Sequence, residues 1–190
     1  EQSDPFKVLI STMLSAQTRD PVTLDASTRL FARAETPGEM VGLREGTIEK
    51  LIYPVSFYRN KARHLKRTCR LLLDRHGGQV PTTMAELLEL PGVGRKTANL
   101  VLIVSLRSQE NICVDTHVHR ISNRLGWVET RTPAETEEAL YQVAARRWWP
   151  LLNLYLVTWG QNVCKPVYPV CGRCAISTLC PRIGVVRVGK

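Results

Sequence analysis

The sequence has no apolar run that approaches the ~20 residues needed to span a bilayer. It also lacks a signal peptide, an internal repeat, a low-complexity tract and a long linker. Hydrophobic residues make up 44% of the chain and charged residues 23%, which is the composition of an ordinary globular protein. These features exclude a membrane protein and a disordered chain. We expect a soluble intracellular protein.

Acidic residues are absent from Ala139 to Lys190, a stretch that carries seven Lys and Arg residues. A second run of seven basic residues lies between Arg59 and Arg75, and the whole chain has a formal net charge of +9. Two separate positive surfaces are typical of a protein that holds a polyanion from both sides. The alternative is a pair of solvated helix faces.

Alternation typical of strands is absent, and helix start signals recur instead. Pro follows Asp at positions 4–5 and 20–21, and Thr36, Thr83 and Thr132 each begin a Thr-x-x-Glu capping box. We predict an all-α protein of two helical domains, residues 1–110 and 111–190. One helix is expected to begin at Pro21, and others to cover about 6–16, 60–76, 94–106, 116–125, 134–146 and 151–160.

The segment Leu90-Pro91-Gly92-Val93-Gly94-Arg95-Lys96-Thr97-Ala98 predicts a hairpin between two helices, at about 90–98. Gly92 and Gly94 lack a Cβ, so the backbone can turn tightly and lie close to a ligand. The first N–H groups of the second helix provide a seat for phosphate. Lys96 lies in the same first turn, where the positive helix end favours its neutral amine. A neutral lysine amine is a nucleophile that can form a Schiff base.

Four cysteines, Cys164, Cys171, Cys174 and Cys180, are separated by six, two and five residues in a loop-rich tail. Four thiolates in so short a segment predict one metal site that orders the loop. Zinc and an iron–sulfur cluster both accept four cysteines, and the spacing alone does not choose between them. Either centre carries about −2 overall and offsets part of the local basic charge. The alternative is four unligated thiols, and we expect the remaining Cys69 and Cys113 in the core.

Asp115 precedes a predicted helix and begins the segment Val114-Asp115-Thr116-His117. It is suited to cap that helix. It is equally suited to accept the proton of Lys96, or to stabilise positive charge that grows on a sugar ring. The two roles are compatible. His117 is expected to pack near Asp115.

These motifs resemble the endonuclease III branch of the helix–hairpin–helix DNA glycosylases. The resemblance rests on Leu14-Ser15-Ala16-Gln17-Thr18, the hairpin segment, the segment around Asp115 and the cysteine spacing, which span nearly the whole chain. It implies a bifunctional enzyme that removes oxidised or reduced pyrimidines from duplex DNA and then cleaves the strand by β-elimination at the abasic site. It also implies two helical domains that flank a DNA-binding cleft, a [4Fe-4S] cluster at residues 164–180, and a monomer in the prokaryotic cytoplasm and nucleoid, or in a eukaryotic nucleus.

The same resemblance assigns individual residues. Lys96 and Asp115 match the catalytic pair, and Gly92, Gly94 and Arg95 match the hairpin that holds a DNA phosphate. Gln17 matches a residue that fills the space left by the extruded base, although a polar residue at a helix end is the alternative. We expect Phe57 to be the wedge that opens the duplex, where the family often has leucine, with core packing as the alternative. His117 is expected to contact DNA.

The sequence departs from the family by lacking the usual helix ahead of Asp4-Pro5. Related branches that act only as mismatch glycosylases lack a lysine at the position of Lys96 or carry tyrosine there. A non-catalytic DNA-binding module, with Lys96 as a simple phosphate contact, is the remaining alternative.

Overall fold

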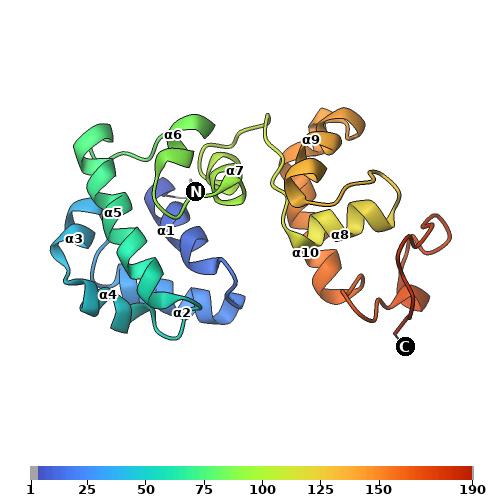
Figure 1. Cartoon of the computed structure of the whole chain (residues 1–190), viewed down its shortest axis with the longest axis horizontal. Helices are drawn as coiled ribbons and strands as arrows, with labels where there is room; N and C mark the ends of the chain where they lie inside the picture. The colour runs from blue at the N-terminus through green and yellow to red at the C-terminus, as the bar shows by residue number, and fades with distance from the viewer. Residues whose placement is uncertain (1–3, 190) are drawn as a thin grey trace. The chain divides into compact units, whose positions relative to one another are not determined.

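The structure, a computed structural model, describes residues 4–189. Every regular element within that range is a helix, which confirms the predicted all-α fold (Figure 1). The chain divides into two compact units, the first ending at Arg107 and the second beginning at Ser108. Every helix in the described range is too short or too polar to cross a lipid bilayer.

The first unit is built around α1 (Pro5–Ser15), which packs against α2, α5 and α7. Six of the eleven residues of α1 are buried, so this helix is apolar over most of its circumference. Asp4 caps it by accepting a hydrogen bond from Phe6 N at 2.9 Å. The other helices of this unit are α2 (Asp20–Phe31), α3 (Pro37–Gly42), α4 (Glu45–Ile52), α5 (Tyr58–His76), α6 (Met84–Glu89) and α7 (Arg95–Val104).

The capping predictions differ in outcome among the three Thr-x-x-Glu sites. Thr36 forms the complete box, in which the Thr hydroxyl and the Glu39 carboxylate each accept a backbone N–H. Thr83 accepts from Glu86 N, but the Glu86 carboxylate accepts the Thr83 hydroxyl instead. Thr132 accepts from Glu135 N. The Thr half of the motif is therefore present at all three sites, since it depends only on local helix geometry.

The second unit is built around α8 (Thr116–Arg124), which packs against α9 (Pro133–Val143) and α10 (Leu152–Asn162). Its core contains Ile112, Val114, Val118, Ile121, Leu140, Leu152 and Leu156. Between α9 and α10 the chain forms a 3₁₀ helix, η1 (Arg146–Leu151), which contains Pro150. Beyond α10 the tail is irregular apart from the short 3₁₀ turn η2 (Cys171–Arg173).

Candidate nucleic-acid interface and metal centre

The predicted hairpin joins α6 to α7 by a tight turn whose apolar residues are buried. Leu90 and Val93 lie in the core of the first unit, and Val93 N donates to Leu90 O at 3.0 Å. Gly92 has a φ of +82°, a conformation that disfavours every residue with a Cβ. The turn thus exposes its glycines while its apolar side chains fix it to the unit.

Two side chains of helix α5 contact this hairpin. Thr68 Oγ1 donates to Pro91 O at 2.8 Å, and the ring of His64 lies against Gly92, where an added Cβ would stand 2.8 Å from His64 Nδ1. Gly94 has an ordinary φ of −103°, and a Cβ there would meet no atom of the described chain within 4 Å. The first glycine is therefore required by the protein's own packing, whereas the second leaves open space beside the backbone.

Lys96 lies in the first turn of α7, directly after the hairpin. Gly94 is the N-cap of this helix, and the first helical hydrogen bond runs from Ala98 N to Gly94 O at 2.9 Å. Thr97 and Ala98 are buried, whereas Lys96 is exposed. The helix is thus fixed to the core by one side of its first turn and presents the lysine amine to solvent near its positive end.

Two exposed loop residues, Gln17 and Phe57, both adopt the left-handed conformation, with φ of 55° and 56°. Phe57 is 64% exposed, which rules out the core-packing alternative for this residue. Gln17 follows the end of α1 and is also exposed. A left-handed backbone at a residue other than glycine costs free energy, and residues with such strain cluster at functional sites.

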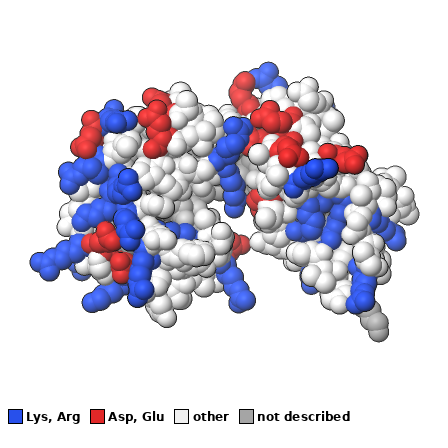
Figure 2. All heavy atoms as spheres, viewed as in Figure 1, with Lys and Arg blue, Asp and Glu red and all other residues white. Residues whose placement is uncertain are grey.

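Helix α5 has an apolar face and a basic face. Its buried residues are Ala62, Leu65, Thr68, Cys69 and Leu72. Figure 2 shows Lys and Arg gathered along the part of the first unit where α5 lies. Four of these basic residues line a groove of about 850 Å³ that reaches the hairpin at Pro91; they are Lys66, Arg67, Arg70 and Arg75. The groove presents positive charge beside the candidate phosphate seat.

In the second unit, Asp115 is the N-cap of α8. Its Oδ1 accepts from His117 N and Val118 N, both at 2.9 Å, so the predicted capping role is confirmed. The His117 side chain lies against Gly160 of α10, with Nδ1 3.1 Å from Arg120 Nη2. The second carboxylate oxygen of Asp115 accepts neither of these capping bonds, so one side chain can cap the helix and serve a second partner.

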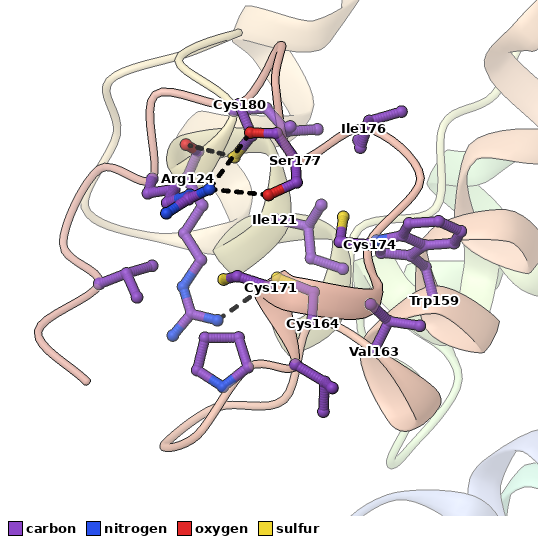
Figure 3. Close-up of a pocket in the computed structure, with 15 residues that line it drawn as sticks. Ile121, Arg124, Trp159, Val163, Cys164, Cys171, Cys174, Ile176, Ser177 and Cys180 are labelled. Carbon is purple, nitrogen blue, oxygen red and sulfur yellow. Dashed lines mark hydrogen bonds between the residues drawn. The ribbon is translucent and has the colours of Figure 1, made fainter. Parts of the chain in front are cut away.

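The four tail cysteines line a single cavity of about 440 Å³, which includes its open mouth. Figure 3 shows them around this cavity, together with apolar side chains that include Ile121, Trp159 and Val163. Within residues 4–189, no three His, Cys, Asp or Glu side chains are close enough to hold a single metal ion. The cavity is nevertheless lined by sulfur, by apolar side chains and by Arg124, Ser177 and Arg182.

Arg124 holds this loop, a contact that the sequence did not predict. The side chain is only 9% exposed. It donates to Cys164 Sγ at 3.4 Å, to Lys165 O at 2.7 Å and to Pro166 O at 2.6 Å. Arg124 O accepts from Ile183 N at 3.1 Å. It also accepts from Cys180 Sγ at 3.7 Å (Figure 3). One residue therefore ties both ends of the cysteine loop to α8.

Comparison with known proteins places this geometry in a family. Residues 10–146 match the family described as "HhH-GPD superfamily base excision DNA repair protein". The chain is 47% identical over 180 residues to endonuclease III of Thermotoga maritima, a match that covers 95% of this chain and 84% of that protein. It is 45% identical to endonuclease III-like protein 1 of Gallus gallus, of which it spans 63%.

Two solved structures have the same fold. A trapped endonuclease III–DNA covalent intermediate matches with a TM-score of 0.90 at 36% identity. A non-covalent endonuclease III–DNA complex matches with a TM-score of 0.89 at 35% identity. Each match covers 96% of this chain and 85% of the other.

The chain therefore belongs to the HhH-GPD superfamily of base excision DNA repair proteins. Within that superfamily it is a member of the endonuclease III family, and it is a DNA glycosylase and AP lyase that acts on DNA.

Proposed function

We propose that Lys96 is the nucleophile of this enzyme and that Asp115 assists it. The observation that carries the proposal is the exposed position of Lys96 in the first turn of α7, directly after the hairpin. The trapped endonuclease III–DNA covalent intermediate, whose fold this chain shares, supports a covalent route. A carboxylate is required because the attacking amine must lose a proton, and Asp115 is held in one orientation by its two capping bonds.

The chemistry needs only this pair, the DNA and one water molecule. The Lys96 nitrogen bonds to C1′ of the deoxyribose as the bond from C1′ to the base breaks, and the base leaves with a proton. The sugar ring then opens to give a Schiff base with Lys96. Loss of a proton from C2′ breaks the C3′–O bond and cleaves the strand on the 3′ side. Hydrolysis of the imine regenerates the amine.

The surrounding residues have roles in DNA binding. Gly92, Gly94 and Arg95 hold a phosphate at the N-terminus of α7, where open space beside Gly94 allows close approach. Gln17 fills the position of the extruded nucleotide and Phe57 enters the base stack. A DNA contact by His117 stays a prediction. The substrates are duplexes with oxidised or reduced pyrimidines or abasic sites, and the enzyme acts on them as a monomer at the cell's DNA.

We further propose that the cysteine cavity holds a [4Fe-4S] cluster ligated by Cys164, Cys171, Cys174 and Cys180. The surroundings fit a centre with negative charge, because burial and the neighbouring charge of Arg124 lower the pKa of Arg120. Arg120 and Arg124 both donate to Cys164, at its carbonyl oxygen and its sulfur. A cluster with four thiolates adds anionic charge beside these guanidinium groups. Its role is to order the tail.

Borohydride trapping tests the assignment of the nucleophile. Incubation with a duplex that contains one abasic site, in the presence of borohydride, reduces a Schiff base to a stable covalent adduct. We expect an adduct that mass spectrometry maps to Lys96. An adduct at a different residue contradicts the proposal, and the absence of any adduct favours a non-catalytic DNA-binding module or a monofunctional glycosylase.

A further inference from the structure

The ammonium group of Lys61, on α5, is enclosed by oxygen atoms from the last turn of α1 and from the following loop, which carries Gln17. Its Nζ donates to Leu14 O at 2.7 Å, to Ala16 O at 2.5 Å and to Thr18 Oγ1 at 3.3 Å. An ammonium has three N–H donors and no acceptor, so three oxygens satisfy it completely. These contacts join residues at least 43 positions apart in the sequence.

The same threonine joins this loop to the one that carries Phe57. Thr18 Oγ1 accepts from Ser56 N at 3.2 Å. Gln17 and Phe57 therefore each neighbour one end of this hydrogen bond. Lys61 completes the arrangement, because it lies in the first turn of α5, of which Phe57 is the N-cap, and Lys61 N donates to Phe57 O at 3.0 Å.

Lys61 is partly buried, and this burial lowers the pKa of its amine to about 8. A half-buried lysine with no carboxylate partner is costly. It is retained here by two backbone carbonyls and a hydroxyl. Loss of one proton would leave two N–H donors for three acceptors.

We propose that Lys61 is a positioning residue that ties the 14–18 loop to the 55–57 loop, so that Gln17 and Phe57 enter the DNA duplex together. The proposal rests on the roles proposed above for these two residues. Both have a backbone conformation that costs free energy by itself. The hydrogen bonds of Lys61 and Thr18 offset that cost before DNA binds. The two loops are therefore already ordered when the base is extruded.

The test compares two DNA substrates that differ only in whether a nucleotide must be extruded. Borohydride trapping is measured on an abasic site in duplex DNA and on the same abasic strand without its complement. Lys61→Met keeps the aliphatic stem and removes all three donors. Lys7→Met serves as the matched control, since Lys7 is a lysine of the same unit whose amine pairs with Glu35 on the surface.

We expect Lys61→Met to trap the duplex roughly 10- to 100-fold more slowly than the unmodified protein, the factor set by loss of charge-assisted hydrogen bonds. Its rate on the single strand should be unchanged, and Lys61→Arg should recover part of the duplex rate. Lys7→Met should match the unmodified protein on both substrates. An equal loss on both substrates, or no loss on the duplex, overturns the proposal.

A second variant covers the case in which Lys61→Met does not fold. Thr18→Val keeps the shape of the side chain but removes the oxygen that accepts from both Ser56 N and Lys61. It should show the same selective loss on the duplex, and an unchanged duplex rate contradicts the tether. Failure of the unmodified protein to trap either substrate would instead overturn the role of Lys96, so the two proposals fail in different ways.

Discussion

The imidazole of His64 occupies the space beside Gly92 into which any side chain at that position would project, with Nδ1 2.8 Å from an added Cβ. Gly92→Ala must therefore displace His64 and also adopt a left-handed backbone, which costs about 1–2 kcal/mol for a residue with a Cβ. We expect a loss of at least that size in the free energy of unfolding, measured with urea.

Gly94→Ala is the matched control for Gly92→Ala. The backbone of Gly94 is ordinary and its surroundings are open within the described chain, so only the weaker N-cap preference of alanine, about 1 kcal/mol or less, opposes folding. DNA affinity should nevertheless fall in this folded variant, because the methyl group occupies the proposed phosphate seat. Unchanged affinity would place the phosphate elsewhere.

Lys96→Gln should abolish the borohydride adduct and keep DNA affinity within a few-fold of the original. Because Lys96 is exposed, we expect this variant to fold normally, so that loss of the adduct reports on chemistry. Surface substitutions usually change the free energy of unfolding by no more than about 0.5 kcal/mol. Thermal unfolding serves as the control for folding. A variant that still forms the adduct at full rate would show that another amine is the nucleophile.

Asp115→Asn separates capping from catalysis. Asparagine caps helices about as well as aspartate, so the variant should retain stability and DNA binding while single-turnover base excision slows greatly. Asp115→Ala should lose the same activity and in addition about 1 kcal/mol of stability, because His117 N and Val118 N lose their acceptor. Normal turnover in the asparagine variant would refute the catalytic role.

Purified protein should be brown and contain iron, as determined by metal analysis. Removal of the cluster should make the tail from Cys164 to Cys180 accessible to protease, while the first unit, which has its own core, stays protected. Colourless protein with one zinc ion per chain would contradict the proposed cluster.

Burial raises the pKa of the Cys69 thiol to about 12. The thiolate is the reactive form, so Cys69 should resist alkylation at pH 8.5 in the folded protein and react once the protein is unfolded. The unfolded thiol ionises near its ordinary pKa of 9.0 while the folded thiol does not. The contribution of the neutral, buried Cys69 thiol to the free energy of unfolding is therefore complete below about pH 9. It is lost as the pH rises from about 9 toward 12. Comparison with Cys69→Ala by urea unfolding at several pH values isolates this loss.

The sequence predicted those features that depend on neighbouring residues. The helix starting at Thr116, its cap at Asp115 and the turn before Lys96 all arise from interactions over a few positions. The all-α fold followed from periodicity and the lack of alternation. The segment after α9 differed from the prediction. The helix expected over 134–146 ends at Val143, and Arg146–Leu151, which contains Pro150, forms a 3₁₀ helix.

Contacts between distant segments were not predictable in this way. Nothing local to Lys61 indicates that its amine reaches Leu14 O, since Arg59 and Arg63 on either side of it are exposed. In the sequence, Arg124 likewise looks like any basic residue near a helix end. Its hydrogen-bond partners lie 40 or more positions away. The left-handed backbone of Phe57 has no sequence signal either, because glycine or asparagine would be expected there.

Helix α8 carries Asp115 at its start and Arg124 in its last turn. Nine residues at 1.5 Å per residue make a rod only about 13 Å long. Arg124, which holds the cysteine tail, and Asp115, the carboxylate proposed for proton transfer, therefore lie on one short, rigid helix. We therefore expect loss of order in the tail to disturb the position of Asp115 through this helix.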